Sequence, residues 1–266
     1  MATWQHASVS TAVAPWPRPG YRPTGRAAIV VLLAFSSGDV LDAAGDLRLA
    51  GVVPATAPVA ALELRRHHYP DSATWFDRWR TGPLRNIALQ QLGNVQPLLE
   101  QASYCYSIRV EVDDPPDLAY LQLVWALAAR LAQAGTSLTL DAAAATWHRQ
   151  ADVAALAPHR PFNIQHEVSV IAETEPVPGF GHPVHTRGMI KFGRPDLIAG
   201  VPADRIEETG RILNHLARRL AEGDVLAAGQ RVRVNERRTL LVSPYVPDET
   251  TPDVVLSDDG LRLIDL

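Results

Sequence analysis

The sequence predicts an α+β protein with a largely antiparallel sheet system, and three patterns support this. Residues 104–112 alternate apolar and polar side chains, as a half-buried strand does. Residues 204–222 carry an apolar stripe at helical spacing. The order strand, helix, strand occurs twice before residue 158. We therefore predict a ferredoxin-like, split βαβ first half with helices on one face of its sheet, followed by a C-terminal helix and hairpins.

The first half begins with residues 27–35, which are short, branched and apolar throughout, as in a strand covered on both faces. Asp117 is placed to cap a long helix that Gly135 ends. The other elements predicted in this half are strands over 59–66 and 136–140 and helices over 39–49, 71–79 and 84–91.

The second half begins with residues 164–173, whose alternation predicts a strand with His166 and Glu167 on opposite faces. A further strand is predicted over residues 184–192. Asp204 and Glu207 have capping-box spacing at the start of the long helix. Two hairpins are predicted after it, over 231–243 and over 254–263, the second with its turn at Asp259-Gly260.

Proline is concentrated in residues 1–25, which we interpret as a flexible arm with Trp4, Trp16 and Tyr21 as anchors. Residues 26–266 are then a single α+β domain of two packed halves that meet near residue 158. The longest apolar run is far shorter than the roughly 20 residues that cross a bilayer, and no secretory signal is present, so we expect a soluble cytoplasmic protein.

A net charge of −4 argues against nucleic acid as the main partner, because phosphate binding needs a dense positive field. Cys105 is the single cysteine, which excludes an intrachain disulfide, and we interpret it as a structural thiol. The sequence has no GxSxG element of serine hydrolases. No cofactor is indicated.

The residues with most chemical potential lie in the stretch 181–195, GHPVHTRGMIKFGRP, which contains the only lysine. One hypothesis is an anion site formed by Thr186, Arg187, Lys191 and Arg194, with flexible backbone at the glycines. The alternative is that these glycines allow turns or close packing and that Arg187 and Lys191 lie on the solvent face of a strand.

A second hypothesis is a metal site. His182 and His185 have the spacing of a metal-ligand pair, and His166, followed by Glu167 as a base, lies upstream. The alternative is that these histidines form hydrogen bonds within a loop and the core.

The pattern TRGMIKFGRPDL, residues 186–197, followed by an amphipathic helix and a hairpin, resembles an uncharacterised bacterial family of the domain-of-unknown-function type. The motif of that family is T-x-G-M-x-K/R-F-G-x-P-D/E-L, and the segment 104–147 is also similar. The resemblance implies a cytoplasmic α+β protein without established catalytic residues. Some members are associated with polymorphic-toxin or stress loci, which implies an immunity or interaction role.

The leading functional hypothesis is a non-enzymatic binding or interaction protein that contacts a protein partner or a small anion through the surface near residues 181–197. The competing hypothesis is a metal-dependent hydrolase that uses His182, His185 and His166. A structural subunit of a homo-oligomer is a third hypothesis.

Overall fold

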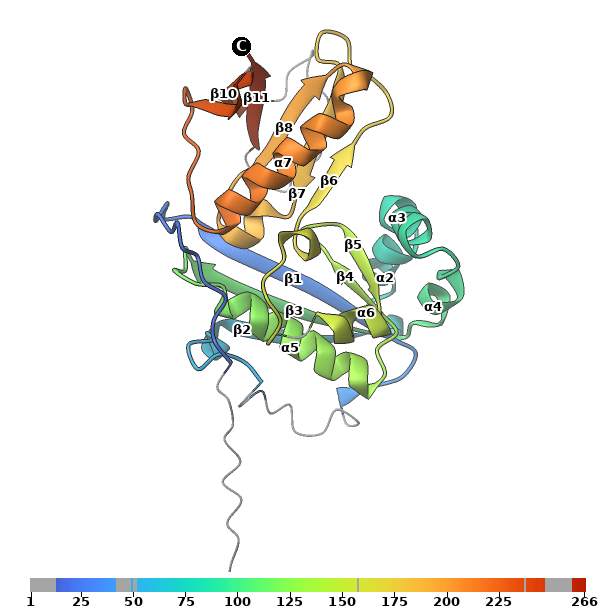
Figure 1. Ribbon diagram of the computed structural model, residues 1–266. Coiled ribbons are helices and arrows are strands. Elements are labelled where there is room, and N and C mark those ends of the chain that lie inside the picture. Colours follow the sequence, from blue (N-terminus) through green and yellow to red (C-terminus); the bar gives the residue numbers. More distant parts are fainter. Residues whose placement is uncertain (1–12, 42–48, 50–51, 157, 237, 247–259) are drawn as a thin grey trace, which may run out of the picture.

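The computed structural model describes the chain except for residues 1–12, 42–48, 50–51, 157, 237 and 247–259. Two β-sheets lie one above the other in the view of Figure 1, with helices packed against both. The α+β class with mostly antiparallel sheets is confirmed. None of the described helices is long and apolar enough to cross a membrane.

The first sheet has five strands in the order β2-β3-β1-β4-β5, and all neighbours are antiparallel. Its strands are β1 (Ala27–Ser36), β2 (Leu62–His68), β3 (Tyr104–Asp113), β4 (Leu138–Asp141) and β5 (Thr146–Arg149). In a ferredoxin-like βαββαβ order the second and third strands follow each other directly, whereas here three α-helices lie between β2 and β3. The ferredoxin-like detail therefore stays a prediction. The helix predicted over 39–49 falls mainly on residues outside the described part.

Helices cover both faces of this sheet, so the prediction that they lie on one face was wrong. On one face, Phe76 and Leu99 pack with Leu33 of β1; on the other, Trp125 packs with Val30. Successive side chains of β1 point to opposite faces of the sheet, and both faces of this strand are apolar. Both faces therefore need helices to bury them. The first face carries α2 (Ala73–Arg80), α3 (Gly82–Leu92) and α4 (Gln96–Gln101), and the second carries α5 (Ala119–Ala134) and α6 (Gln150–Ala155).

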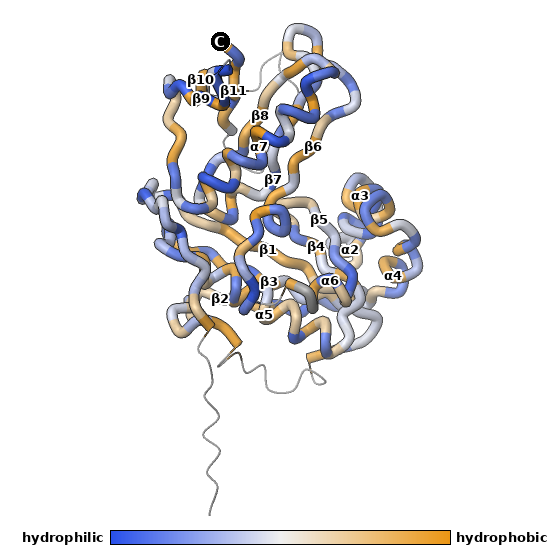
Figure 2. Tube along the Cα trace, in the orientation of Figure 1, coloured by the Kyte–Doolittle hydropathy of each residue, from blue (hydrophilic) through white to orange (hydrophobic). Residues whose placement is uncertain are grey.

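The second sheet has six strands in the order β6-β7-β8-β11-β10-β9, of which only β8 and β11 run parallel. Its strands are β6 (Ser169–Ala172), β7 (His182–Arg187), β8 (Asp196–Val201), β9 (Arg231–Asn235), β10 (Arg238–Tyr245) and β11 (Gly260–Asp265). The helix α7 (Ile206–Ala221) packs across β6, β7 and β8. Figure 2 shows hydrophilic and hydrophobic segments alternating along α7, as expected for a helix with one buried face.

The hairpin predicted over 231–243 is confirmed as the antiparallel pair β9 and β10. The second predicted hairpin is different, because Gly260 lies in a strand opposite Tyr245 and Asp196 rather than in a turn. The rest of its first strand, residues 254–259, lies outside the described residues.

Local hydrogen bonding changes three further elements. The predicted strand 164–173 begins as a 3-10 turn, because the Asn163 side chain accepts from the Gln165 N–H and so offers the backbone an alternative to a strand. The predicted strand 184–192 ends at Gly188, whose φ of 113° starts another 3-10 turn. The predicted capping box is absent, since α7 begins at Ile206 without a side-chain cap. The short turns are η1 (Val59–Ala61), η2 (Tyr69–Asp71), η3 (Ile164–His166), η4 (Met189–Phe192) and η5 (Ala203–Arg205).

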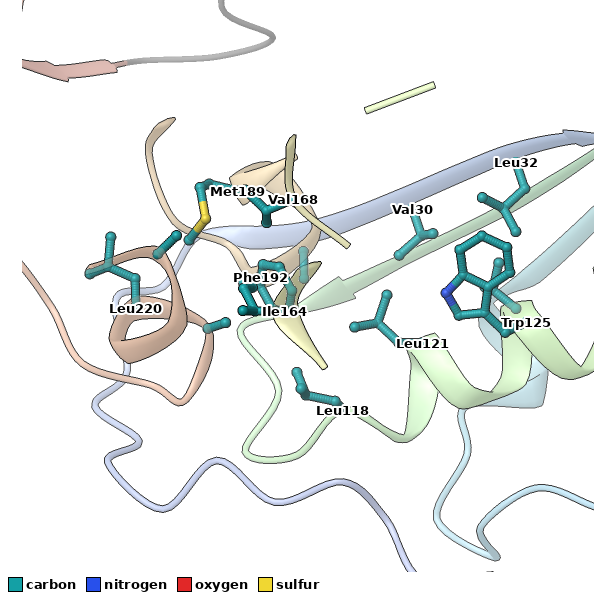
Figure 3. Packing of buried hydrophobic residues seen from close by; sticks show 14 of the residues in the cluster. Val30, Leu32, Leu118, Leu121, Trp125, Ile164, Val168, Met189, Phe192 and Leu220 are labelled. Carbon is teal, nitrogen blue, oxygen red and sulfur yellow. The ribbon is translucent and has the colours of Figure 1, made fainter. Parts of the chain in front are cut away.

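The two halves share one hydrophobic core. Figure 3 shows Trp125 and Leu121 of α5 beside β1, and Phe192, Met189 and Leu220 from the second half at the other end of the same cluster. The turns η3 and η4 supply the apolar side chains between α5 and α7. A continuous core of this kind is what a single domain of two packed halves requires.

The segment predicted as a flexible arm packs closely against the body over residues 13–25. Arg18 is buried, and its guanidinium donates to the carbonyls of Ala221 at 3.0 Å and Phe192 at 3.1 Å. Arg194 donates to the Arg22 carbonyl at 2.8 Å and to Asp114 at 3.1 Å. Two of the predicted anchors make contacts: the Trp16 backbone N–H donates to the Gln122 side chain, and the Tyr21 hydroxyl donates to the Asp114 carbonyl. Trp4, the third, lies outside the described residues. Prolines therefore prevent regular structure here without preventing order.

Candidate functional site

A charged cluster lies at the centre of the molecule, where the two halves meet. Its members are Lys191 of η4, Asp141 at the end of β4, Glu167 before β6 and Trp125 of α5; we call it the Lys191 cluster. The Lys191 ammonium is 0% exposed and donates to both carboxylates, at 2.6 Å to Glu167. The Trp125 Nε1–H donates to the other Glu167 oxygen at 2.7 Å. Every charge in this cluster therefore has a direct partner.

Burial by itself lowers the pKa of Lys191, but the charges of Asp141 and Glu167 outweigh it, so the pKa of Lys191 is raised. His148 of β5 is nearby and packs edge-on to Trp125. Burial lowers the pKa of His148, and its Nε2 has no hydrogen-bond partner among the described residues. The two carboxylates thus favour the charged form of Lys191, and burial favours the neutral form of the adjacent imidazole.

The cluster also shapes the surface next to it. The second oxygen of Asp141 accepts from the N–H groups of Ala143 and Ala144, at 3.1 Å each. These bonds hold the turn between β4 and β5, in which Ala145 adopts a left-handed φ of 52°. This turn forms one wall of a cleft.

The cleft lies between the two sheets and has a volume of about 690 Å³, within the ~300–1,000 Å³ range of ligand sites. One wall is the face of β6 and β7 that points away from α7, and α3 and the β4–β5 turn form the opposite wall. Its lining residues are Ile87, Gln90, Gln91, Ala144, Ala145, Ser169, Val170, Ile171, Glu173, Glu175, Val177, Pro183, His185 and Arg187.

Arg187 is the cation of the cleft. Its side chain has neither a hydrogen bond nor an ion pair with any of the described residues, and its Nε–H is buried. An unpaired guanidinium with a buried N–H favours binding of a carboxylate or phosphate, because it accepts such a group in bidentate geometry and is otherwise left unsatisfied.

His185 and Glu173 form a second polar pair in the cleft. His185 is 2% exposed, and its Nε2 lies 3.2 Å from Glu173 Oε1. Its Nδ1 lies 3.3 Å from the Thr186 carbonyl oxygen. Both facing atoms are acceptors, so a neutral ring donates to only one of them. The hydroxyl of Ser169, on the neighbouring strand β6, instead lies 3.0 Å from the Thr146 hydroxyl, so His185 does not activate it.

Of the four residues predicted to bind an anion, only Arg187 reaches the cleft. Thr186 is buried and donates to Asp196 at 2.8 Å while accepting from the Leu197 N–H. Lys191 is fully buried in the Lys191 cluster. Arg194 is 1% exposed and donates hydrogen bonds to Asp114 and to the Arg22 carbonyl of the N-terminal segment. These three side chains are used for architecture rather than for an anion site. The alternative that Lys191 lies on the solvent face of a strand does not agree with its burial either.

The residues predicted for a metal site do not converge either. His182 and His185 are three apart on β7 and so point to opposite faces of the sheet. His166 lies in η3, beside Asn163. Within the described parts of the chain, no group of three or more His, Cys, Asp or Glu residues could hold a metal ion. Cys105 is buried among apolar side chains, which raises the pKa of its thiol well above its usual value.

Sequence reasoning missed Glu173, Glu175 and Gln90 as cleft residues. The alternation of residues 169–173 places Ser169, Ile171 and Glu173 on one face and could have identified that face as mixed in polarity. It could not show that α3 and the β4–β5 turn lie opposite, because that depends on the packing of the two halves.

Comparison of the chain with protein-family models, with curated proteins and with solved structures gave no match. The family suggested by residues 186–197 therefore stays a prediction, and function is argued from the geometry of this chain.

Proposed function

We propose that this protein is a non-enzymatic binding protein and that the cleft between its two halves is its ligand site. The observation that carries the proposal is Arg187, a guanidinium without a partner among the described residues, on the wall of a cleft of about 690 Å³. The charged groups that line the cleft are complementary to a ligand that has both a carboxylate and a hydrogen-bond donor. Arg187 would bind the carboxylate, and Glu173 and Glu175 would accept from the donor.

The polar groups of the cleft favour binding over catalysis. The two ring nitrogens of His185 face the Thr186 carbonyl and the Glu173 carboxylate rather than a nucleophile, so His185 is poorly placed as a general base. The buried Cys105 lies in the hydrophobic cluster of α2 to α4, away from the cleft lining. The other polar side chains of the cleft can recognise a ligand by its charge and by its hydrogen-bonding groups.

The proposal also covers the cellular location and the biological role of the protein. A cytoplasmic location and an immunity or stress-related role follow from the resemblance of residues 186–197 to the bacterial family described above. The acidic overall charge favours a protein or small-molecule ligand over nucleic acid.

A fragment screen tests the proposal. Small carboxylate-bearing and amine-bearing fragments would be added to the purified protein and to the variant Arg187→Gln, with binding followed by amide chemical shifts. We expect carboxylates to shift the amides of β6, β7 and the β4–β5 turn, and this response to be lost in the variant. Carboxylate fragments that leave those amides unshifted would contradict the proposal.

The metal-dependent hydrolase is tested separately by metal analysis of the purified protein and of His185→Ala. We expect no stoichiometric metal in either. Stoichiometric metal in the parent that disappears in the variant would support the hydrolase instead.

A further inference from the structure

The cleft has one feature that a site for a small molecule alone does not need, which is an open strand edge. Strand β6 is the first strand of the six-stranded sheet, and among the described strands it pairs with β7 alone. In Figure 1 it lies at the margin of the upper sheet, on the side of α3. An edge strand presents unpaired backbone groups to whatever lies beside it.

The register identifies which groups point outward. Glu173 N–H donates to the Pro183 carbonyl at 2.8 Å, so this opposed pair is hydrogen-bonded. Because hydrogen-bonded and non-bonded pairs alternate in an antiparallel ladder, Ile171 and Ser169 also direct their backbone groups toward β7. The N–H and C=O groups of Val170 and Ala172 therefore point away from β7, and no partner among the described residues accepts or donates to them.

The side chains next to this edge have a defined charge order. Arg187 lies opposite Ser169 in the register of β6 and β7, and both residues line the cleft. Glu173 lies four residues further along β6, about 13 Å away at roughly 3.3 Å per residue, on the same face. Glu173 is half exposed, with 49% of its side chain accessible, so it can pair with a ligand cation.

One end of the groove is closed. The hydroxyls of Thr146 in β5 and Ser169 in β6 are 3.0 Å apart, which joins the two sheets beside Arg187. A chain lying along β6 must therefore end, or turn outward, close to the guanidinium. The other end, toward Glu173 and Glu175, lies in an exposed part of the chain.

We propose that the natural ligand of the cleft is an extended peptide segment of a protein partner, which pairs with the outward backbone groups of Val170 and Ala172 and places the side-chain carboxylate of an acidic residue near its end against Arg187. A basic side chain four residues from that carboxylate meets Glu173. This proposal rests on the proposed function, since it names the class of ligand for the same cleft. Strand addition supplies affinity through main-chain hydrogen bonds, and the two charges supply register.

Panning a displayed library of random-sequence peptides on the full chain tests this, followed by affinity measurements with synthetic copies of the enriched peptides. We expect enriched peptides to have an acidic and a basic residue four positions apart. Ala172→Pro removes one outward N–H without affecting the bonds to β7, so it should weaken binding at least about tenfold. Ala172→Thr retains that N–H and is the matched control. Arg187→Gln should weaken binding by a similar factor.

The outcomes separate the two proposals. Peptides that bind equally well to the parent and to Ala172→Pro would overturn strand pairing. If no peptide is enriched while carboxylate fragments still shift the cleft amides, the peptide proposal is wrong and the proposed function stands. Should Ala172→Pro fail to fold, hydrogen exchange of the Val170 and Ala172 amides in the parent decides instead: slower exchange on peptide binding supports pairing, and unchanged exchange contradicts it.

Discussion

Lys191 and Arg187 are four residues apart in the chain, yet their surroundings differ in every respect that matters for function. Lys191 is 0% exposed and has two carboxylates in contact, whereas Arg187 lies on the wall of an open cleft with no partner among the described residues. Gly188 separates them, because its left-handed φ turns the chain from β7 into η4 and so directs the two cations to different environments.

The difference teaches how a cluster of cations in a sequence should be interpreted. A buried charge that is fully paired stabilises one arrangement of the chain and has no free hydrogen-bonding group for a ligand. An unpaired charge in a cleft contributes little to stability and retains its capacity to bind. Stability and binding should therefore separate cleanly between these two residues.

The largest effect is expected for Lys191→Met. This substitution leaves Asp141 and Glu167 as buried carboxylates without a cation, which should lower the free energy of unfolding by about 3–5 kcal/mol. Chemical denaturation would measure the loss. Replacing the two carboxylates as well, with Asp141→Asn and Glu167→Gln, should recover part of it. A loss below about 1 kcal/mol would show that the cluster is not the paired unit described above.

Gly188→Ala should have the next largest effect. A Cβ at this position would lie 2.6 Å from the Glu167 carbonyl oxygen and would force a left-handed φ of 113° on alanine. We expect a destabilisation of about 2 kcal/mol or more, from thermal and chemical denaturation. Gly179→Ala is the matched control, because Gly179 also has a left-handed φ, of 75°, but a Cβ there would meet nothing within 4 Å. Equal losses at the two glycines would argue against close packing at Gly188.

His148 should give a smaller, pH-dependent effect. Burial depresses its pKa, so the folded state keeps the ring neutral while the unfolded state takes up a proton below about pH 6.5. The associated stability is present above that pH and is lost as the pH falls, by at most about 1.4 kcal/mol per pH unit. His148→Gln should therefore flatten the dependence of the unfolding free energy on pH. The same substitution at the exposed His215 is the matched control, and parallel pH curves for His148→Gln and the parent would contradict the expectation.

The smallest effect on stability is expected for Arg187→Gln. Since the guanidinium has no partner among the described residues, the free energy of unfolding should fall by less than about 0.5 kcal/mol, while carboxylate binding in the cleft is lost. Denaturation and ligand titration on the same preparation would measure both. A large loss of stability would place Arg187 with Lys191 as an architectural residue and would remove the contrast between them.

Elements with a strong local pattern could be predicted from the sequence. The alternation of residues 104–112 became β3, with Tyr106 and Ile108 on one face and Cys105 on the other. Strand β8 was missed, because its short sequence DLIAGV contains a glycine that weakens any strand pattern. Gly200 is nevertheless required there, since the Phe180 backbone and ring lie so close that no Cβ would fit.

The candidate site was only partly predictable for the same reason. Its Arg187 was identified from the sequence, but Thr186, Lys191 and Arg194 were grouped with it because residue types alone do not say which side chains are buried. Their partners lie far away in the chain: Asp141 is 50 residues from Lys191 and Asp114 is 80 from Arg194.

The sequence by itself determined the α+β class, the strong helices and the residue types available near Gly188, because periodicity and turn chemistry act over a few residues. Only the tertiary structure decided that Lys191 is sealed between two halves while Arg187 faces a cleft. The physical reason is that the cost of burying a charge depends on partners that folding brings from distant parts of the chain.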